Sequence, residues 1–218
     1  MSALLSKPLL PYLDLRKPPP NLIAWWAIAG VLAHAALRVA VAFGQFEFAT
    51  AESDIQGIEV QHAADHRQFR VEVLDAALVL FAGLAVIYWL VQVRQFCEAR
   101  SGRAAHRLAR MWGILGWLPV VNLVVPRRYL LDIWRATAPA SASAFLVHVW
   151  WVLWLARIGS LMVEWVRFGG PPEQAAIQDR HWYLLWTVQH CFVTCLGAVV
   201  FAAVVLRIRS WQRAAYLG

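Results

Sequence analysis

The sequence predicts an all-α integral membrane protein: a four-helix bundle with a short re-entrant or interfacial segment and a cytoplasmic amphipathic helix. Apolar residues make up 61% of the 218 residues, only 15% are charged, and the apolar residues gather in four long runs. Soluble domains seldom have so few charges, and the strands of a membrane barrel would alternate polar and apolar residues. We therefore expect one membrane domain over residues 21–206.

Each apolar run is long enough to cross a bilayer. About 20 residues at roughly 1.5 Å rise per residue cover a ~30 Å hydrocarbon core, and a helix pairs its backbone groups internally. Residues 1–20 contain five prolines and no charged region followed by an apolar core, so we expect an extended cytoplasmic arm and no cleavable signal. The expected spans are 21–43, 74–93, 145–168 and 183–206, followed by a basic cytoplasmic tail, 207–218.

The distribution of charge predicts the orientation. Arginine and lysine are retained on the cytoplasmic side, and they gather in the arm, in the second connection and in the tail, whereas the first connection is rich in acids. Both termini are therefore expected in the cytoplasm. The net charge of +7 is attributed to a basic face from Arg94 to Arg135, where anionic lipid headgroups attract each basic residue by about 1 kcal/mol. No nucleic-acid motif accompanies this charge, so no nucleic-acid partner is expected.

An apolar stretch over residues 111–125 is too short for a normal span. Gly113 and Gly116 loosen a helix, Pro119 removes a backbone donor, and Asn122 brings an amide that lipid does not hydrogen-bond. We expect this segment to dip into the membrane and return. Residues 126–138 place Leu130, Ile133 and Trp134 on one side of a helix, which we expect to lie along the inner membrane surface.

The segment from Gly116 to Pro126, followed by Asp132-Ile133-Trp134, resembles the W-x-x-P-x-x-N-x-x-x-P…IW signature of a bacterial domain-of-unknown-function family, number 4328. The resemblance implies a multi-span membrane protein of the bacterial inner membrane, of unknown activity, and it carries over no catalytic residue. Two interpretations of the motif stay open: residues that shape and satisfy a broken helix, or a ligand or ion contact at the break. The matching positions are Trp117, Pro119, Asn122, Pro126 and Trp134.

Ionisable residues inside the spans are costly, from about 2.5 kcal/mol each, so each needs a partner or a wet cavity. All of them fall in the outer half of the predicted bundle, where opposite charges can neutralise one another. Two interpretations stay open: an ion network that fixes helix register, or an outward-facing site for a small ligand, ion or proton. The candidate residues are His34, Arg38, Asp75, Arg157, Glu164 and His190.

Reactive motifs are missing from the sequence: it has no Gly-x-Ser-x-Gly elbow, no His-Glu-x-x-His zinc pair and no phosphate-binding glycine loop. Cys97, Cys191 and Cys195 are odd in number and predict packing, not a disulfide framework. His62 and His66 offer only two ligands for a surface metal. We therefore expect no enzymatic activity, no metal and no cofactor.

Three functions follow in order of preference. The first is a non-enzymatic interaction or assembly component in contact with the lipid bilayer and with a membrane protein partner or a second copy. The second is a small transporter or channel subunit that uses the polar residues as its site. The third and weakest is a b-type haem protein, with His34 and His190 at matched depth as axial ligands. Small residues offer close-packing faces for oligomers at Ala29 with Ala33, and at Ala198 with Ala202.

Overall fold

The computed structural model describes most of the chain, and its described part is mostly helical, with no strand. The expected arm and the position of Pro119 lie outside this part, as do the side chains of Glu164, His62 and His66. The described ranges are 19–50, 57–101, 108–109, 111–118, 120–168 and 180–217, and within them the side chains of 45–50, 57–68, 100–101, 164–168 and 180–184 are not described.

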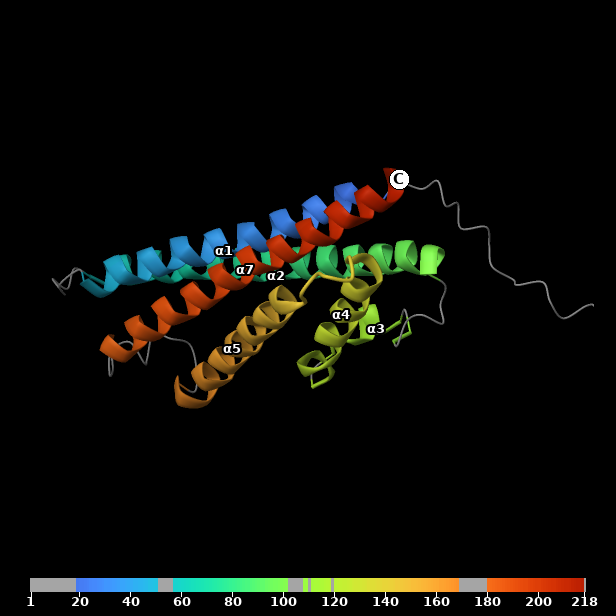
Figure 1. Ribbon diagram of the computed structural model, residues 1–218. Helices are drawn as coiled ribbons and strands as arrows, with labels where there is room; N and C mark the ends of the chain where they lie inside the picture. The colour runs from blue at the N-terminus through green and yellow to red at the C-terminus, as the bar shows by residue number, and fades with distance from the viewer. Residues whose placement is uncertain are drawn as a thin grey trace, which may run out of the picture.

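Four long helices confirm the predicted membrane bundle (Figure 1). Each contains a stretch that is long and apolar enough to cross a membrane. The long helices extend beyond the apolar runs at several ends, because the flanking polar residues continue the helix. They are α1 (Asn21–Thr50), α2 (Gly57–Ser101), α5 (Phe145–Phe168) and α7 (Arg180–Leu217), and the shorter elements are α3 (Trp112–Leu115), the 3₁₀ turn η2 (Val121–Leu123) and α4 (Val125–Thr137).

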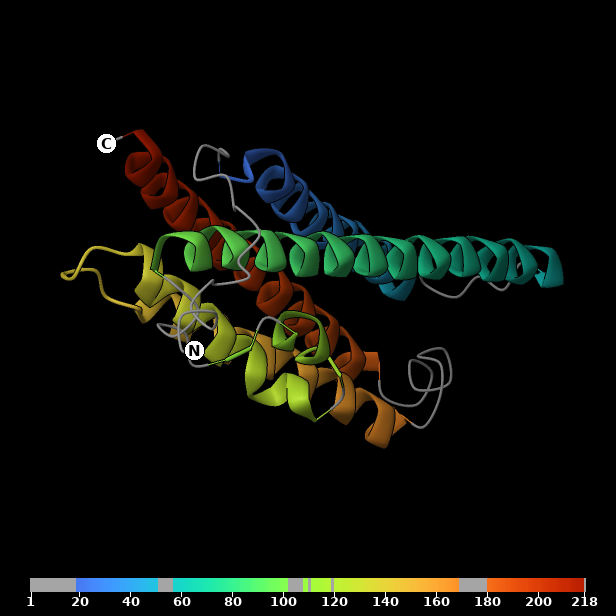
Figure 2. The ribbon, with the colours of Figure 1, turned by 90° about the vertical axis from the view of Figure 1, so that its right-hand side faces the viewer.

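The long helices pack in the order α2, α1, α7, α5. Helix α1 lies between α2 and α7, and α7 lies between α1 and α5 (Figures 1 and 2). At Gly30 of α1 an added Cβ would lie 3.1 Å from the Ala82 Cα of α2, so the lack of a side chain allows the two backbones to approach closely. Helix α4 packs against α2, α5 and α7 at one end of the bundle, here called the α4 end.

The start of α1 and the last turns of α7 meet at this α4 end. Arg209 Nε donates a hydrogen bond of 2.8 Å to Asn21 Oδ1, and the Arg209 guanidinium lies 4.7 Å from the centre of the Trp25 ring. Trp134 of α4 and Trp211 of α7 form an edge-to-face pair with ring centroids 4.7 Å apart. The start of α1 and the end of α7 therefore lie at the same end of the bundle. A chain that crosses a membrane four times requires this arrangement.

Apolar side chains lie on the outside of the bundle as well as in its core. Trp89, Trp150 and Phe201 form a buried aromatic contact between α2, α5 and α7, with ring centroids 5.6 and 5.9 Å from Phe201. Leu80 and Phe192 are 65% exposed on outer surfaces of α2 and α7. Helices that are apolar on all sides are typical of lipid surroundings, so the outer surface fits contact with the bilayer.

The connection before α4 packs closely against it. An added Cβ at Gly113 would lie 2.9 Å from Tyr129 Oη, and one at Gly116 would lie 2.7 Å from Val125 Cγ1. Both glycines are therefore needed for the approach of α3 to α4, which is a role different from loosening a helix. Whether this connection dips into the membrane stays a prediction.

Helix α4 packs its apolar side against the rest of the protein. Pro126 stands in its first turn, where the missing N–H and fixed φ suit a helix start. Leu130, Ile133 and Trp134 are buried as the predicted apolar side, but seven of the 13 residues of α4 are buried, including Asp132. The apolar side of α4 therefore packs on the ends of α2, α5 and α7, and the position of α4 along the inner membrane surface stays a prediction.

Candidate functional site

The tertiary fold brings together four of the residues that the sequence selected as polar positions inside the spans. His34 Nε2 lies 3.3 Å from Asp75 Oδ1, and Arg38 Nη1 lies 3.8 Å from Asp75 Oδ2. Arg157 Nη2 lies 3.5 Å from His34 Nε2. One group thus links α1, α2 and α5 about 20 Å along α1 from its start, at 1.5 Å per residue.

Helix α7 adds a fifth member. His190 is 3% exposed and lies within electrostatic range of Arg38, Arg157, His34 and Asp75. One turn later, Cys195 Sγ lies 3.8 Å from the Ala35 carbonyl oxygen, which fixes this part of α7 beside α1. We call His34, Arg38, Asp75, Arg157 and His190 the His34 cluster.

Buried polar atoms in and beside the His34 cluster lack hydrogen-bond partners among the described residues. Arg38 Nε and Arg157 Nε are two of these, and Asp75 Oδ1 is a third, since its 3.3 Å contact with His34 lacks hydrogen-bond alignment. Buried polar groups are normally paired with protein, water or a ligand, and leaving one unpaired costs about 1–3 kcal/mol. The described residues therefore satisfy the hydrogen-bonding groups of this cluster only in part.

Helix α7 presents a stripe of such atoms at intervals of one turn. The unpartnered atoms are Trp186 Nε1, His190 Nδ1 and Thr194 Oγ1, and residues four apart share one helix face. The candidate residues selected from the sequence include His190 but not Trp186. The four-residue spacing from Trp186 to His190 was the signal that could have included it.

Aromatic side chains border the His34 cluster on α5. The Arg157 guanidinium lies 5.9 Å from the centre of the Trp154 ring, within the range of a cation–π contact. Trp154 in turn stacks near Trp150 at 6.3 Å and meets Trp117 edge to face at 5.8 Å. Trp117 belongs to the sequence motif, so the connection before α4 reaches the aromatic row that leads to Arg157.

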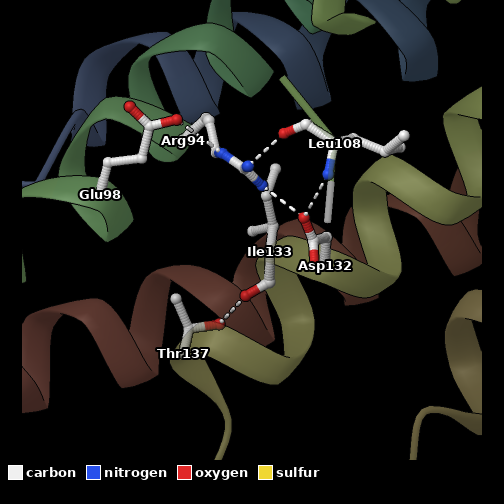
Figure 3. Close-up of polar contacts among 6 residues, drawn as sticks. All are labelled: Arg94, Glu98, Leu108, Asp132, Ile133 and Thr137. Atoms are coloured by element: carbon white, nitrogen blue, oxygen red, sulfur yellow. Dashed lines mark hydrogen bonds and ion pairs between the residues drawn. The ribbon is translucent and has the colours of Figure 1, made fainter. Parts of the chain in front are cut away.

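A second polar group at the α4 end was missed by the sequence interpretation (Figure 3). Arg94 Nη1 donates a 2.7 Å bond to Asp132 Oδ2, and Arg94 Nε donates a 3.0 Å bond to Glu98 Oε1. Arg94 Nη2 also donates to the Leu108 carbonyl oxygen. The Arg94 guanidinium lies 5.4 Å from the centre of the Tyr129 ring. We call Arg94, Glu98, Leu108, Tyr129 and Asp132 the Arg94 cluster.

The Arg94 cluster changes the expected basic face. Arg94 is 1% exposed and ion-paired, so it is not available to lipid headgroups. Arg127 Nε donates to His148 Nδ1 at 3.2 Å, whereas Arg128 and Arg135 are exposed. Between Arg94 and Arg135, two arginines with described side chains, Arg128 and Arg135, therefore face outward.

The other described motif residues lie in α4 and in the turn η2 before it. Pro126 and Trp134 are buried in α4, and the Asn122 backbone N–H donates to the Leu118 carbonyl oxygen at 2.8 Å. The Asn122 side-chain oxygen is buried and has no partner among the described residues. Val120 next to Pro119 has a φ of 66°, an unusual backbone conformation for a β-branched residue.

Metal and haem binding find little support in this geometry. Among the side chains that the structure describes, no group of three His, Cys, Asp or Glu residues is placed to hold a metal ion. His34 Nε2 faces Asp75 at 3.3 Å and Arg157 at 3.5 Å, so this nitrogen does not point to an open axial position. His62 and His66 lie outside the described side chains.

The His34 cluster can bind but has no evident means to react. Guanidinium, indole and hydroxyl groups donate hydrogen bonds, and no activated nucleophile stands beside a base among the described members. The small-residue faces differ in availability: Ala29 and Ala33 are exposed, but Ala198 is buried inside the bundle. The first pair alone remains open to a second copy.

Comparison with known proteins yields one match. Residues 56–210 match the family model described as Domain of unknown function (DUF4328), which confirms the resemblance seen in the sequence. The matched range includes the motif positions, the Arg94 cluster, and Asp75, Arg157 and His190 of the His34 cluster. No curated protein and no solved structure matches the chain.

Proposed function

The chain belongs to the DUF4328 family, and we propose that it is a small transporter or channel subunit without enzymatic activity of its own. The observation that best supports this proposal is the His34 cluster, in which buried donors on α1, α5 and α7 have no partner among the described residues. A network with only a structural role would be expected to satisfy its own atoms, as the Arg94 cluster does. A ligand or ion that passes or rests there would complete the missing contacts.

The proposed orientation follows from the arginines. Arg128, Arg135, Arg207 and Arg213 are exposed on elements of the α4 end. We propose that this end faces the cytoplasm of a bacterial inner membrane, with both termini there. The His34 cluster then lies toward the outside, about 28 Å from Arg94 when counted along α2 from Asp75 at 1.5 Å per residue.

Reconstitution tests this function. Proteoliposomes with the full chain should carry ions or small solutes across the membrane, detected by a potential-sensitive dye and by tracer uptake. Arg157→Leu should abolish the flux, and Arg135→Leu, an exposed arginine far from the cluster, should leave it unchanged. Equal flux in the wild type and Arg157→Leu would contradict the proposal.

A second function, an interaction or assembly component, is favoured by the same exposed arginines. Arg128 and Arg135 on α4 point away from the bundle and fit anionic headgroups or an acidic partner. Replacement of both by Gln should reduce the retention of anionic lipids or the yield of a cross-linked partner. The haem alternative would require a Soret band in the purified protein.

A further inference from the structure

We propose that the His34 cluster binds a small monovalent anion. This inference rests on the proposed function, because it names the class of ligand for the same site. It follows from the chemical nature of the unpartnered atoms and from the charge of the described side chains around them.

The unpartnered atoms are mainly hydrogen-bond donors. Arg38 Nε, Arg157 Nε and Trp186 Nε1 can only donate, and Thr194 Oγ1 can donate or accept. His190 Nδ1 donates in one tautomer. The only member of this set that accepts without being able to donate is Asp75 Oδ1, which faces His34 at 3.3 Å. A ligand that lies beside these donors has to accept hydrogen bonds.

The charges point the same way. Among the described members, Arg38 and Arg157 carry two positive charges and Asp75 carries one negative charge. Arg38 Nη1 contacts Asp75 Oδ2 at 3.8 Å, so this carboxylate balances one guanidinium. Among the described residues, Arg157 contacts the imidazole of His34, at 3.5 Å, and the ring of Trp154, and it forms no ion pair. A monovalent anion beside Arg157 would neutralise the remaining charge.

Several polar side chains of this site are buried, which strengthens their hydrogen bonds to an anion. His34, His190 and Thr194 are 4%, 3% and 5% exposed. Donors that are shielded from water bind an anion more strongly than donors on a surface. The site is thus built of buried polar side chains from separate helices, which distinguishes it from a patch of surface arginines.

The size of the ligand follows from the packing. Helices α1 and α7 approach closely enough for Cys195 Sγ to lie 3.8 Å from the Ala35 carbonyl oxygen, next to His34 in the chain. This close packing of α1 and α7 favours a small ligand over a bulky organic anion. Chloride and formate are small acceptors with one charge, and they serve as probes.

Anion binding is measured on the purified full chain in detergent micelles. Chloride and formate are titrated against gluconate at constant ionic strength, and the thermal unfolding midpoint reports binding to the folded state. Both probes should raise the midpoint in a saturable way. Tracer chloride uptake into proteoliposomes provides a second readout.

Variants locate the site. Arg157→Gln should weaken chloride binding about tenfold or more, because a charge-assisted hydrogen bond is lost, and Thr194→Val should weaken it severalfold at unchanged side-chain shape. Arg135→Gln is the matched control and should bind as the wild type does. A loss in Arg135→Gln equal to that in Arg157→Gln would overturn the proposed location.

The outcomes separate this inference from the proposed function. Saturable stabilisation by chloride or formate that disappears in Arg157→Gln supports an anion site. If cations or protons cross the membrane at a rate that does not depend on these anions, the transporter function is supported. The same result overturns the anion site. Anion binding that appears only in Glu164→Gln would show that the chain's own carboxylate occupies the site, which also overturns the proposal.

Discussion

Two polar clusters of similar composition differ in how completely the protein satisfies them. In the Arg94 cluster, all three guanidinium nitrogens of Arg94 have acceptors, with bonds of 2.7 Å to Asp132 and 3.0 Å to Glu98. In the His34 cluster, the contacts are 3.3 to 3.8 Å long and two guanidinium Nε atoms lack partners among the described residues. The difference teaches that the charges inside the bundle are not equally well paired: the first cluster joins helices by short bonds, and the second has donors that no described residue satisfies.

The position of each cluster supports this division. The Arg94 cluster ties α2 to α4 and to Leu108 in the connection before α3, so it holds the least regular part of the described chain in place. The His34 cluster lies between long helices that already pack well, where no such fastening is required. Good geometry is expected where a charge pair stabilises the fold, because otherwise its desolvation is not compensated.

The largest expected effect is on the Arg94 cluster. Arg94→Leu leaves Asp132 and Glu98 without their shared cation in a buried environment, and removal of one partner from a buried pair costs about 3–5 kcal/mol. The free energy of unfolding, measured by circular dichroism in mixed micelles with increasing dodecyl sulfate, should fall by this amount. Arg135→Leu is the control and should change it by less than about 0.5 kcal/mol. A loss in Arg94→Leu no greater than in this control would remove the distinction between the clusters.

A smaller effect is expected at the glycine beneath Tyr129. In Gly113→Ala, the new Cβ would lie 2.9 Å from Tyr129 Oη and 3.0 Å from Cζ, so the tyrosine has to move from its place beside Arg94. Overpacking of this kind costs about 1–3 kcal/mol. The same unfolding measurement checks it, and Gly159→Ala, where nothing lies within 4 Å of an added Cβ, is the control. Equal effects at the two glycines would show that the approach of α3 to α4 does not matter.

The His34 cluster should respond in the opposite sense. Arg157 forms no ion pair with a described residue, and burial of an unpaired charge costs free energy that its removal relieves. Arg157→Leu should therefore change the free energy of unfolding by less than about 1 kcal/mol, or raise it, while flux and anion response are lost. A loss of 3 kcal/mol or more, as for a buried pair, would identify the cluster as structural.

The smallest effect on stability is expected at Asn122. Its side-chain oxygen has no partner among the described residues, so Asn122→Leu removes no hydrogen bond and should alter the free energy of unfolding by less than about 1 kcal/mol. Unfolding in micelles and flux in proteoliposomes are measured on the same sample. If Asn122→Leu fails to fold, Asn122 stabilises the fold at the α4 end. If flux alone is lost, the transport site extends from the His34 cluster to the motif segment.

The sequence indicated the members of the His34 cluster but not those of the Arg94 cluster. His34, Arg38, Asp75, Arg157 and His190 are ionisable residues within apolar runs, and their cost in lipid indicates that they need partners. Arg94 and Asp132 gave no such signal, because Arg94 lies near the end of a run and Asp132 lies on a helix with other charges. An arginine near a span end has the same sequence pattern whether it faces headgroups or a buried acid.

By itself, the sequence determined that the chain is helical and crosses a membrane, since run length and continuous apolarity leave a helix as the only way to pair the backbone in lipid. Only the tertiary structure decided which polar residues meet. Ion pairs such as Arg94 with Asp132, or His34 with Asp75, join residues that are distant in the chain, and their contact depends on how helices pack. Periodicity describes one helix at a time, so it gives the face of each residue but not the partner that the face meets.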